Sequence, residues 1–275
     1  MDLEIREPAE QVPLERIAPR RSTGVWIAAG LFLVAAAAAV YVAFRARVPE
    51  LAPAPTAPRA AATTKPLGGD APAITLPPLD QSDGVVADLV RKLSSHPQVA
   101  AWLTTNGLIR NFTVVVTNIA EGKTPAKLLP PLRPVGPFRV VERDGGIYAD
   151  SRNDERYRPL ADAVASIDAR GAASLYATVK PRIEDADREL GQPAGSFDAT
   201  LERAIVLLLE TPVKSAPRRL RLHGIGYAYA DPDDDQLTAA QKQLVRMGPA
   251  NARVVQAKLR EIALALGIPA ERLPR

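Results

Sequence analysis

The chain has 275 residues, no cysteine and two histidines, and its 35 lysines and arginines nearly balance its 31 aspartates and glutamates. The lack of cysteine excludes thiol nucleophiles, cysteine-ligated zinc and iron–sulfur clusters. A formal net charge of only +4, with no basic stripe along any predicted helix, argues against a nucleic acid as partner.

Residues 24–44 contain no charged residue and are bracketed by arginines on both sides. At about 1.5 Å per residue, a helix of this length reaches roughly 32 Å, enough to cross the hydrocarbon core of a bilayer. Trp26 and Tyr41, near its ends, are typical of the membrane–water boundary. A removable signal peptide has a shorter apolar core. We therefore predict a polar tail at 1–22 and a single transmembrane helix at 23–45.

Residues 46–79 are rich in proline and alanine, which predicts an extended, solvated linker. Arginines on the two sides of the predicted span are nearly equal in number, so the positive-inside rule does not decide the orientation. A short tail, one span, a linker and a distal domain are a familiar arrangement in bacterial envelope proteins. By this analogy we expect an inner-membrane protein whose domain at 80–275 is periplasmic. The reverse orientation gives a membrane-tethered cytoplasmic adaptor.

Apolar residues in the predicted domain recur mostly with helical spacing. Pro181 should kink or break one of the helices. Ser196 is placed to cap a helix, and Thr238 and Gln241 have the spacing of a capping box. The apolar stripes predict helices near 85–93, 97–102, 108–119, 160–167, 175–190, 201–209 and 249–266.

Two short stretches have the signature of β-hairpins. Residues 138–142 and 147–148 flank an Asp-Gly-Gly turn, and residues 219–223 and 227–229 flank a turn with two glycines. The predicted fold class is therefore mainly α with small antiparallel β-hairpins, a helix-dominated α+β fold, with a single N-terminal transmembrane helix. Because a two-stranded ribbon is marginal alone, the hairpins should pair with each other or lie on helices.

Three segments carry a resemblance to a known family: Asn111 to Asn118, Gly195 to Asp198, and Arg246 to Arg253. With them, the stretch from about Leu79 to Leu266 resembles an uncharacterised bacterial domain-of-unknown-function family, number 3014 in its series. The resemblance implies an N-terminal span, a Pro-rich linker and a helical domain. It implies no reaction, ligand or active site.

The second predicted hairpin is the first candidate binding surface. Arg219 and Arg221 alternate with leucines that should face the core, and Tyr227 and Tyr229 share a face of the returning strand. Arginines beside tyrosines can hold an anionic polymer or the carboxylates of a partner protein. A solvated strand edge, protected by charge against pairing with other chains, is the structural alternative.

The second candidate surface is the segment from Arg246 to Arg253. Gly248 and Pro249 are suited to a corner between two helices, and Asn251 lies where it can bond across that corner. Alternatively, Arg246 and Arg253 beside the N-terminus of the last helix form an anion site. A helix–turn–helix DNA reader is a third alternative, against which the charge balance argues.

No catalytic signature, metal site or cofactor site is predicted. The acidic run at 231–235 lacks the glycine and glutamate of an EF-hand loop, so we expect a solvated turn. His96 is expected at a helix boundary, and His223 has no identifiable carboxylate partner. The expected function is therefore noncatalytic binding or scaffolding in the cell envelope, with an envelope polymer or a protein as partner. The alternative is an unrecognised hydrolase acting on an envelope polymer.

Overall fold

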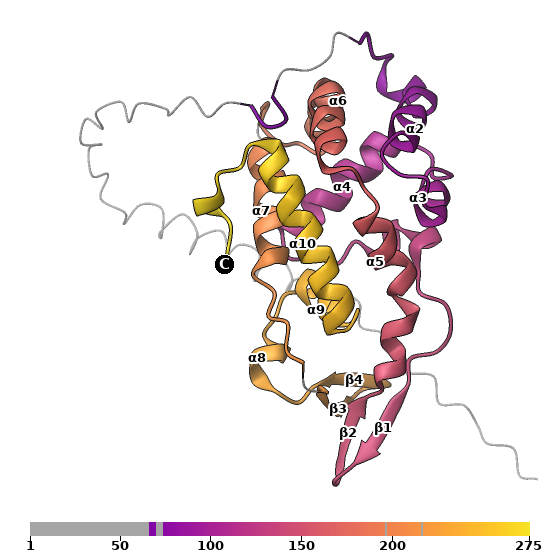
Figure 1. Ribbon diagram of the computed structural model, residues 1–275, viewed down its shortest axis with the longest axis vertical. Helices are drawn as coiled ribbons and strands as arrows, with labels where there is room; N and C mark the ends of the chain where they lie inside the picture. Colours follow the sequence, from indigo (N-terminus) through magenta and orange to yellow (C-terminus); the bar gives the residue numbers. More distant parts are fainter. Residues whose placement is uncertain (1–65, 70–73, 196, 216) are drawn as a thin grey trace, which may run out of the picture. The chain divides into compact units, whose positions relative to one another are not determined.

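The computed structural model of the protein describes residues 66–69, 74–195, 197–215 and 217–275, which form helices and one small sheet (Figure 1). The helical stripes predicted from the sequence coincide with α2 to α7 and α10 within a few residues. The helices are α2 (Asp83–Arg91), α3 (Pro97–Trp102), α4 (Leu108–Ala120), α5 (Arg158–Ala165), α6 (Ala169–Glu189), α7 (Phe197–Leu209), α8 (Pro232–Asp235), α9 (Ala239–Val245) and α10 (Pro249–Leu266). The 3-10 helices are η1 (Leu79–Gln81), η2 (Ala126–Leu128), η3 (Pro130–Leu132), η4 (Ser151–Arg156) and η5 (Ala270–Arg272).

The two predicted hairpins form one antiparallel sheet in the order β1–β2–β3–β4. The strands are β1 (Val140–Arg143), β2 (Gly146–Ala149), β3 (Arg219–His223) and β4 (Gly226–Tyr229). Strands β2 and β3, far apart in the sequence, pair through Ile147 with Leu220 and Tyr148 with Arg219. This confirms that the hairpins pair with each other, and the sheet lies next to the junction of α9 and α10 (Figure 1).

The main core lies among helices α2, α4, α6, α7 and α10. At its centre Phe197 is fully buried, with its ring 6.0 Å from that of Phe112 and 6.4 Å from that of Tyr176, measured between centroids. The neighbouring Asp198 accepts hydrogen bonds from the Tyr176 hydroxyl at 2.6 Å and from Lys180 at 2.5 Å. One apolar and one charged residue at the start of α7 therefore join it to α4 and α6.

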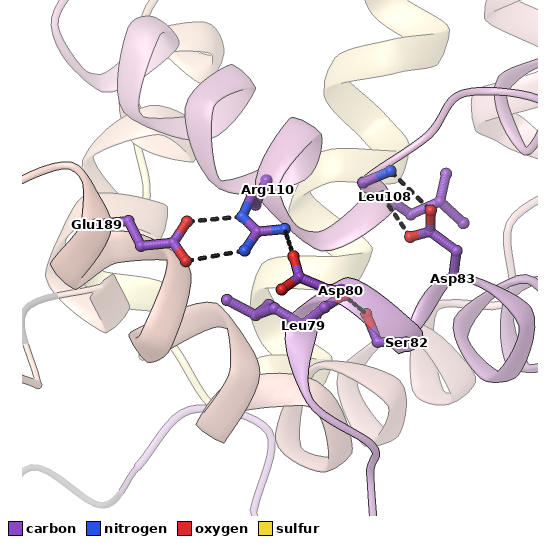
Figure 2. A network of polar contacts seen from close by, with 8 residues as sticks. Leu79, Asp80, Ser82, Asp83, Leu108, Arg110 and Glu189 are labelled. Atoms are coloured by element: carbon purple, nitrogen blue, oxygen red, sulfur yellow. Dashed lines mark hydrogen bonds and ion pairs between the residues drawn. The ribbon is translucent and has the colours of Figure 1, made fainter.

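A second polar network joins α4 to η1 and α6, as Figure 2 shows. Arg110 binds both carboxylate oxygens of Glu189, at 2.6 and 2.9 Å, and also Asp80 at 2.8 Å. The Asp83 carboxylate accepts from the main-chain amides of Gly107 and Leu108, at 2.7 and 2.8 Å, and so caps the start of α4. These contacts hold the N-terminal elements of the domain against the longer helices.

The structure differs from the sequence-based predictions in one helix and at the start of the domain. Of the kink or break expected at Pro181, the break does not occur, because α6 continues through this residue, which lies exposed on its surface. The core also begins before the predicted domain boundary at residue 80, because Leu67 and Leu76 are buried in it. Arg182 holds this segment through the main-chain oxygens of Pro77 and Leu76.

The fold class is confirmed as a helix-dominated α+β fold, but its transmembrane component is corrected. Within the described residues, no helix is both long enough and apolar enough to cross a membrane. Even the longest, α6 and α10, carry charged residues such as Lys180 and Arg260 along their length. The predicted span at 23–45, the tail at 1–22 and residues 46–65 of the predicted linker lie outside the described residues.

An apolar cavity of about 480 Å³ runs through the helical body. Its walls come from α2 to α7 and α10, and from the segment around Leu129 and Leu132. The cavity is partly open to solvent, so it is a deep apolar pocket and not an enclosed void.

We expect a fragment of residues 63–275 to fold independently and to melt cooperatively, whereas a fragment starting at residue 80 should be less stable. The shorter fragment lacks Leu67 and Leu76, and each fully buried leucine contributes about 1.5–3 kcal/mol. For a domain of this size, the loss corresponds to a melting temperature lower by at least about 6 °C. Circular dichroism during heating measures this difference.

The matched control is Ile74→Ala in the longer fragment, because Ile74 lies in the same segment but is 44% exposed. It should leave the melting temperature nearly unchanged. Equal melting temperatures for the two fragments would show that the segment before residue 80 contributes nothing to the core.

Candidate functional site

A second cavity, of about 1200 Å³, lies between the sheet and the junction of α9 and α10. Both candidate surfaces from the sequence contribute to it, which makes it the candidate site. Cationic side chains outnumber acidic ones in its lining. The cations are Arg143, Arg152, Arg156, Lys214, Arg218, Arg221, Lys242 and Arg246, and the acids are Asp150, Asp154 and Asp235.

The second hairpin does not form the predicted recognition face. In the register of the sheet, Leu220 lies opposite Tyr229 and Leu222 opposite Tyr227. Because side chains on one strand alternate between faces, the tyrosines share a face with the leucines, and Arg219 and Arg221 project from the other. Leu222, expected to face the core, is 71% exposed because it lies beyond the edge of the core near the hairpin tip.

Three of the four residues predicted in this hairpin nevertheless line the cavity: Arg221, Tyr227 and Tyr229. Arg219 does not line it. Tyr227 is partly exposed, and its ring lies 6.2 Å from that of Phe138, between centroids. Tyr229 is buried beneath Arg218, and burial raises the pKa of its phenol. The positive charges of Arg246 and Arg218 oppose this rise, so both cations lie close to the phenol.

The acidic run at 231–235 holds the sheet against the rest of the domain and is not the solvated turn that we predicted. It forms the short helix α8, capped by Asp231. Asp234 is only 2% exposed and is paired with Arg218 and, at 3.0 Å, with Lys214. Asp235 pairs with Arg221 at 2.8 Å, and this hydrogen bond lowers the pKa of its carboxyl. A buried carboxylate requires such partners, and they come from the strand region.

The junction of α9 and α10 confirms the predicted helix–helix corner. Gly248 has φ +84° and ψ 158°, a conformation almost restricted to glycine, and Pro249 is the first residue of α10. A Cβ at position 248 would overlap the carboxylate of Asp154. The Asn251 amide donates to the main-chain oxygens of Met247 at 2.7 Å and Asp154 at 2.8 Å. Asn251 is therefore a structural link between α10 and η4, and it does not line the cavity.

Arg246, the other residue predicted in this corner, lines the cavity and is exposed. Among the described residues, no carboxylate lies within ion-pair distance of it, and its one side-chain contact is with the Gln243 amide oxygen at 3.4 Å. Arg156 is similar, since its guanidinium binds the main-chain oxygens of Val135 and Gly136. These two cations are held in place without being neutralised.

Two aspartates of the cavity differ in their ionisation. Hydrogen bonds from the Arg152 side chain hold the pKa of Asp150 below its ordinary value. Burial raises the pKa of the Asp154 carboxyl, with a smaller effect from the negative charge of Glu155. Carboxyl groups with pKa values shifted in opposite directions are typical of acid–base sites. Ion-pair networks that only stabilise the fold also shift pKa values in this way.

Within the part of the chain that the structure describes, no group of histidine and carboxylate side chains is arranged to hold a metal ion. His96 caps α3 by accepting from the Gln98 amide at 3.2 Å, as expected of a boundary residue. His223 lines the cavity near the tip of β3.

Several lining residues were not predicted from the sequence, mainly Arg152, Arg156, Lys214 and Asp154. They lie in the loops and the 3-10 helix that flank the strands, where no periodic pattern marks a face. Basic residues that follow the first predicted hairpin and precede the second were the available signal, but the sequence does not show which of them converge.

We expect Gly248→Ala to destabilise the protein by about 2–6 kcal/mol, because it adds backbone strain to the overlap with Asp154. Gly191→Ala is the matched control, since Gly191 has φ +81° but open space around it. It should cost only about 1–2 kcal/mol. Chemical denaturation of the full-length protein measures both free energies of unfolding.

In an Asp154→Ala background, Gly248→Ala should cost less than in the wild type, because the overlapping carboxylate is gone and only the backbone strain remains. An unchanged cost in that background would show that backbone strain alone makes glycine necessary at position 248.

Comparison with known proteins identifies the family but no activity. A family model described as "Protein of unknown function (DUF3014)" matches residues 108–263, more than half of the chain. All three segments that carried the sequence resemblance lie within this range, so the resemblance is confirmed. No curated protein and no solved structure matches the chain. The protein therefore belongs to the DUF3014 family of proteins of unknown function.

Proposed function

We propose that the domain is a noncatalytic binding module that holds an anionic polymer of the bacterial cell envelope in the cavity between the sheet and the α9–α10 corner. The observation that supports this most directly is the excess of cationic over acidic side chains in the lining of the cavity.

Arg246 and Arg156 are the side chains best suited to an anionic ligand. The other cations of the lining are largely offset by aspartates, as in the pairs of Arg221 with Asp235 and Arg152 with Asp150. Arg246 and Arg156 have no carboxylate partner among the described residues, and arginine binds carboxylates and phosphates with two parallel hydrogen bonds. An incoming anion therefore gains contacts here without first breaking an ion pair.

The size of the cavity favours a polymer over a small metabolite. Sites for small molecules are usually about 300–1,000 Å³ and close around their ligand. This cavity is larger, at about 1200 Å³, and has the partly exposed rings of Phe138 and Tyr227 at its side. Aromatic rings and arginines are the residue types enriched in binding surfaces.

Binding of an anionic polysaccharide, with heparin fragments as the probe, tests this proposal on the full-length protein. Arg246→Ser should raise Kd about 10- to 100-fold, since a hydrogen bond to a charged group contributes about 1.5–3 kcal/mol. The wild-type affinity should fall with added salt. Melting should stay nearly unchanged, because exposed substitutions rarely exceed about 0.5 kcal/mol.

Arg219→Ser is the matched control, because Arg219 is an exposed arginine of the same region that does not line the cavity. It should leave Kd nearly unchanged. No binding by the wild type, or equal loss in both variants, would contradict the proposal. Tighter binding of poly-glutamate would indicate an acidic protein partner, and tighter binding of duplex DNA would contradict the expectation that nucleic acid is not bound.

A hydrolase acting on an envelope polymer is the second candidate, favoured by the opposite pKa shifts of Asp150 and Asp154. In this reading Asp154 is the proton donor, because its raised pKa keeps it protonated to higher pH. The weakness of this candidate is that Asp150 is fully engaged, capping η4 and binding Arg152.

If the second candidate is correct, turnover of a polymer substrate should fall as pH rises through the raised pKa of Asp154, because the donor loses its proton. Asp154→Asn should then abolish turnover and leave binding of the polymer intact. Binding without turnover in the wild type at every pH excludes this candidate and retains the first.

The expected periplasmic location, and the alternative of a cytoplasmic adaptor, stay predictions, since neither depends on any residue described above.

A further inference from the structure

The apolar cavity of the helical body is separate from the cavity beside the sheet, which we call the cationic cavity because arginines and lysines predominate among its charged lining residues. No charged side chain lines it, and its surface is almost entirely hydrocarbon. Residues from seven helices contribute, among them Val86, Phe112, Val179, Ile205 and Leu266. Many of these side chains are themselves buried, so the cavity reaches into the core, and it is partly open to solvent.

Its volume indicates the size of the molecule that would fill it. A dry apolar cavity of about 150 Å³ accommodates one benzene molecule. The present cavity, at about 480 Å³, is roughly three times as large and would therefore hold about 18 carbon atoms. Water is poorly suited to fill this apolar cavity, because a buried water needs two to four polar partners.

The few polar groups of the lining are mostly already bonded within the protein. The Tyr176 hydroxyl donates to Asp198, and the Asn111 amide joins the Trp102 indole to the main-chain oxygen of Leu128. The side-chain amide of Gln98 is the exception, since it has no partner among the described residues. Gln98 lies on α3 with Trp102, and both residues are half-buried and line the cavity.

From this geometry we infer that the helical body holds a hydrocarbon chain of a lipid, with the chain inside the apolar cavity and its polar end near Gln98. The apolar lining matches a chain of methylene groups and provides no partner for a charged ligand inside the core. A bound chain removes this apolar lining from contact with water. The inference does not depend on the proposed polymer site.

Thermal unfolding of the full-length protein with two probes tests the inference and distinguishes free fatty acids from membrane lipids as the source. The probes are palmitate and 1-palmitoyl-lysophosphatidylcholine, with octanoate as the short-chain control. At a free concentration about a hundred times Kd, a bound chain should raise the melting temperature by about 5–10 °C. Octanoate should give a clearly smaller shift, because it fills less than half of the volume.

Ala204→Phe is the variant that should prevent binding, because Ala204 is buried in α7 and lines the cavity. A phenyl ring there occupies part of the space, so the palmitate-induced shift should largely disappear. Ala250→Phe is the matched control: Ala250 is exposed on α10 and does not line the cavity, so the shift should persist. If Ala204→Phe does not fold, Val115→Trp narrows the cavity from a half-buried position on α4.

Native mass spectrometry of the protein as purified gives an independent result. A bound mass that corresponds to a long-chain lipid supports the inference. Two results would overturn it: no shift with either long-chain probe together with no bound lipid, or a palmitate shift that persists undiminished in the cavity-filling variant.

Discussion

The position of the candidate site depends on the close approach of Asp154 to Gly248. Because position 248 has no side chain, η4 can pack directly against the corner between α9 and α10. Asn251 then joins α10 to the main chain of η4, and Asn153 joins η4 to the residue before β1 through Arg139. The sheet is thus fixed relative to the helices by a few short-range contacts. Any side chain at position 248 would separate the two walls of the cationic cavity.

Charged side chains are placed differently around the two cavities. In the helical body, charged side chains such as Arg110 and Asp198 form bonds at the ends of helices, which leaves the interior apolar. Beside the sheet, charges are buried together, as in the pairing of Asp234 with Arg218 and Lys214. Because buried charges are stable only when paired, the cations that lack a carboxylate partner remain at the accessible surface. Arg246 and Arg156 are therefore available to the anionic ligand that we propose.

The segments that define the family resemblance serve mainly to build the fold. In the first segment, Asn111 connects α4 to α3 and to the 124–132 segment, and in the second, Asp198 joins α7 to α6. The third forms the corner, and Arg246 is its one charged residue that lines the cationic cavity. Membership of the family therefore explains the architecture of the domain, whereas the proposed ligands rest on the chemistry of the two cavities.

Local patterns in the sequence determined most of the secondary structure. Helical spacing located the main helices, the glycine turns located both hairpins, and the capping box at Thr238 and Gln241 is present. The bond of Asn251 across the corner was also predictable, because it depends on a turn of only a few residues. Only the tertiary structure decided which residues meet across long separations in the chain. The faces of the tyrosines and arginines depend on cross-strand register, the burial of Asp234 depends on Arg218, and both cavities depend on how distant elements pack. Periodicity specifies which side of an element is apolar, but it does not specify which other element covers that side or how much space remains between them.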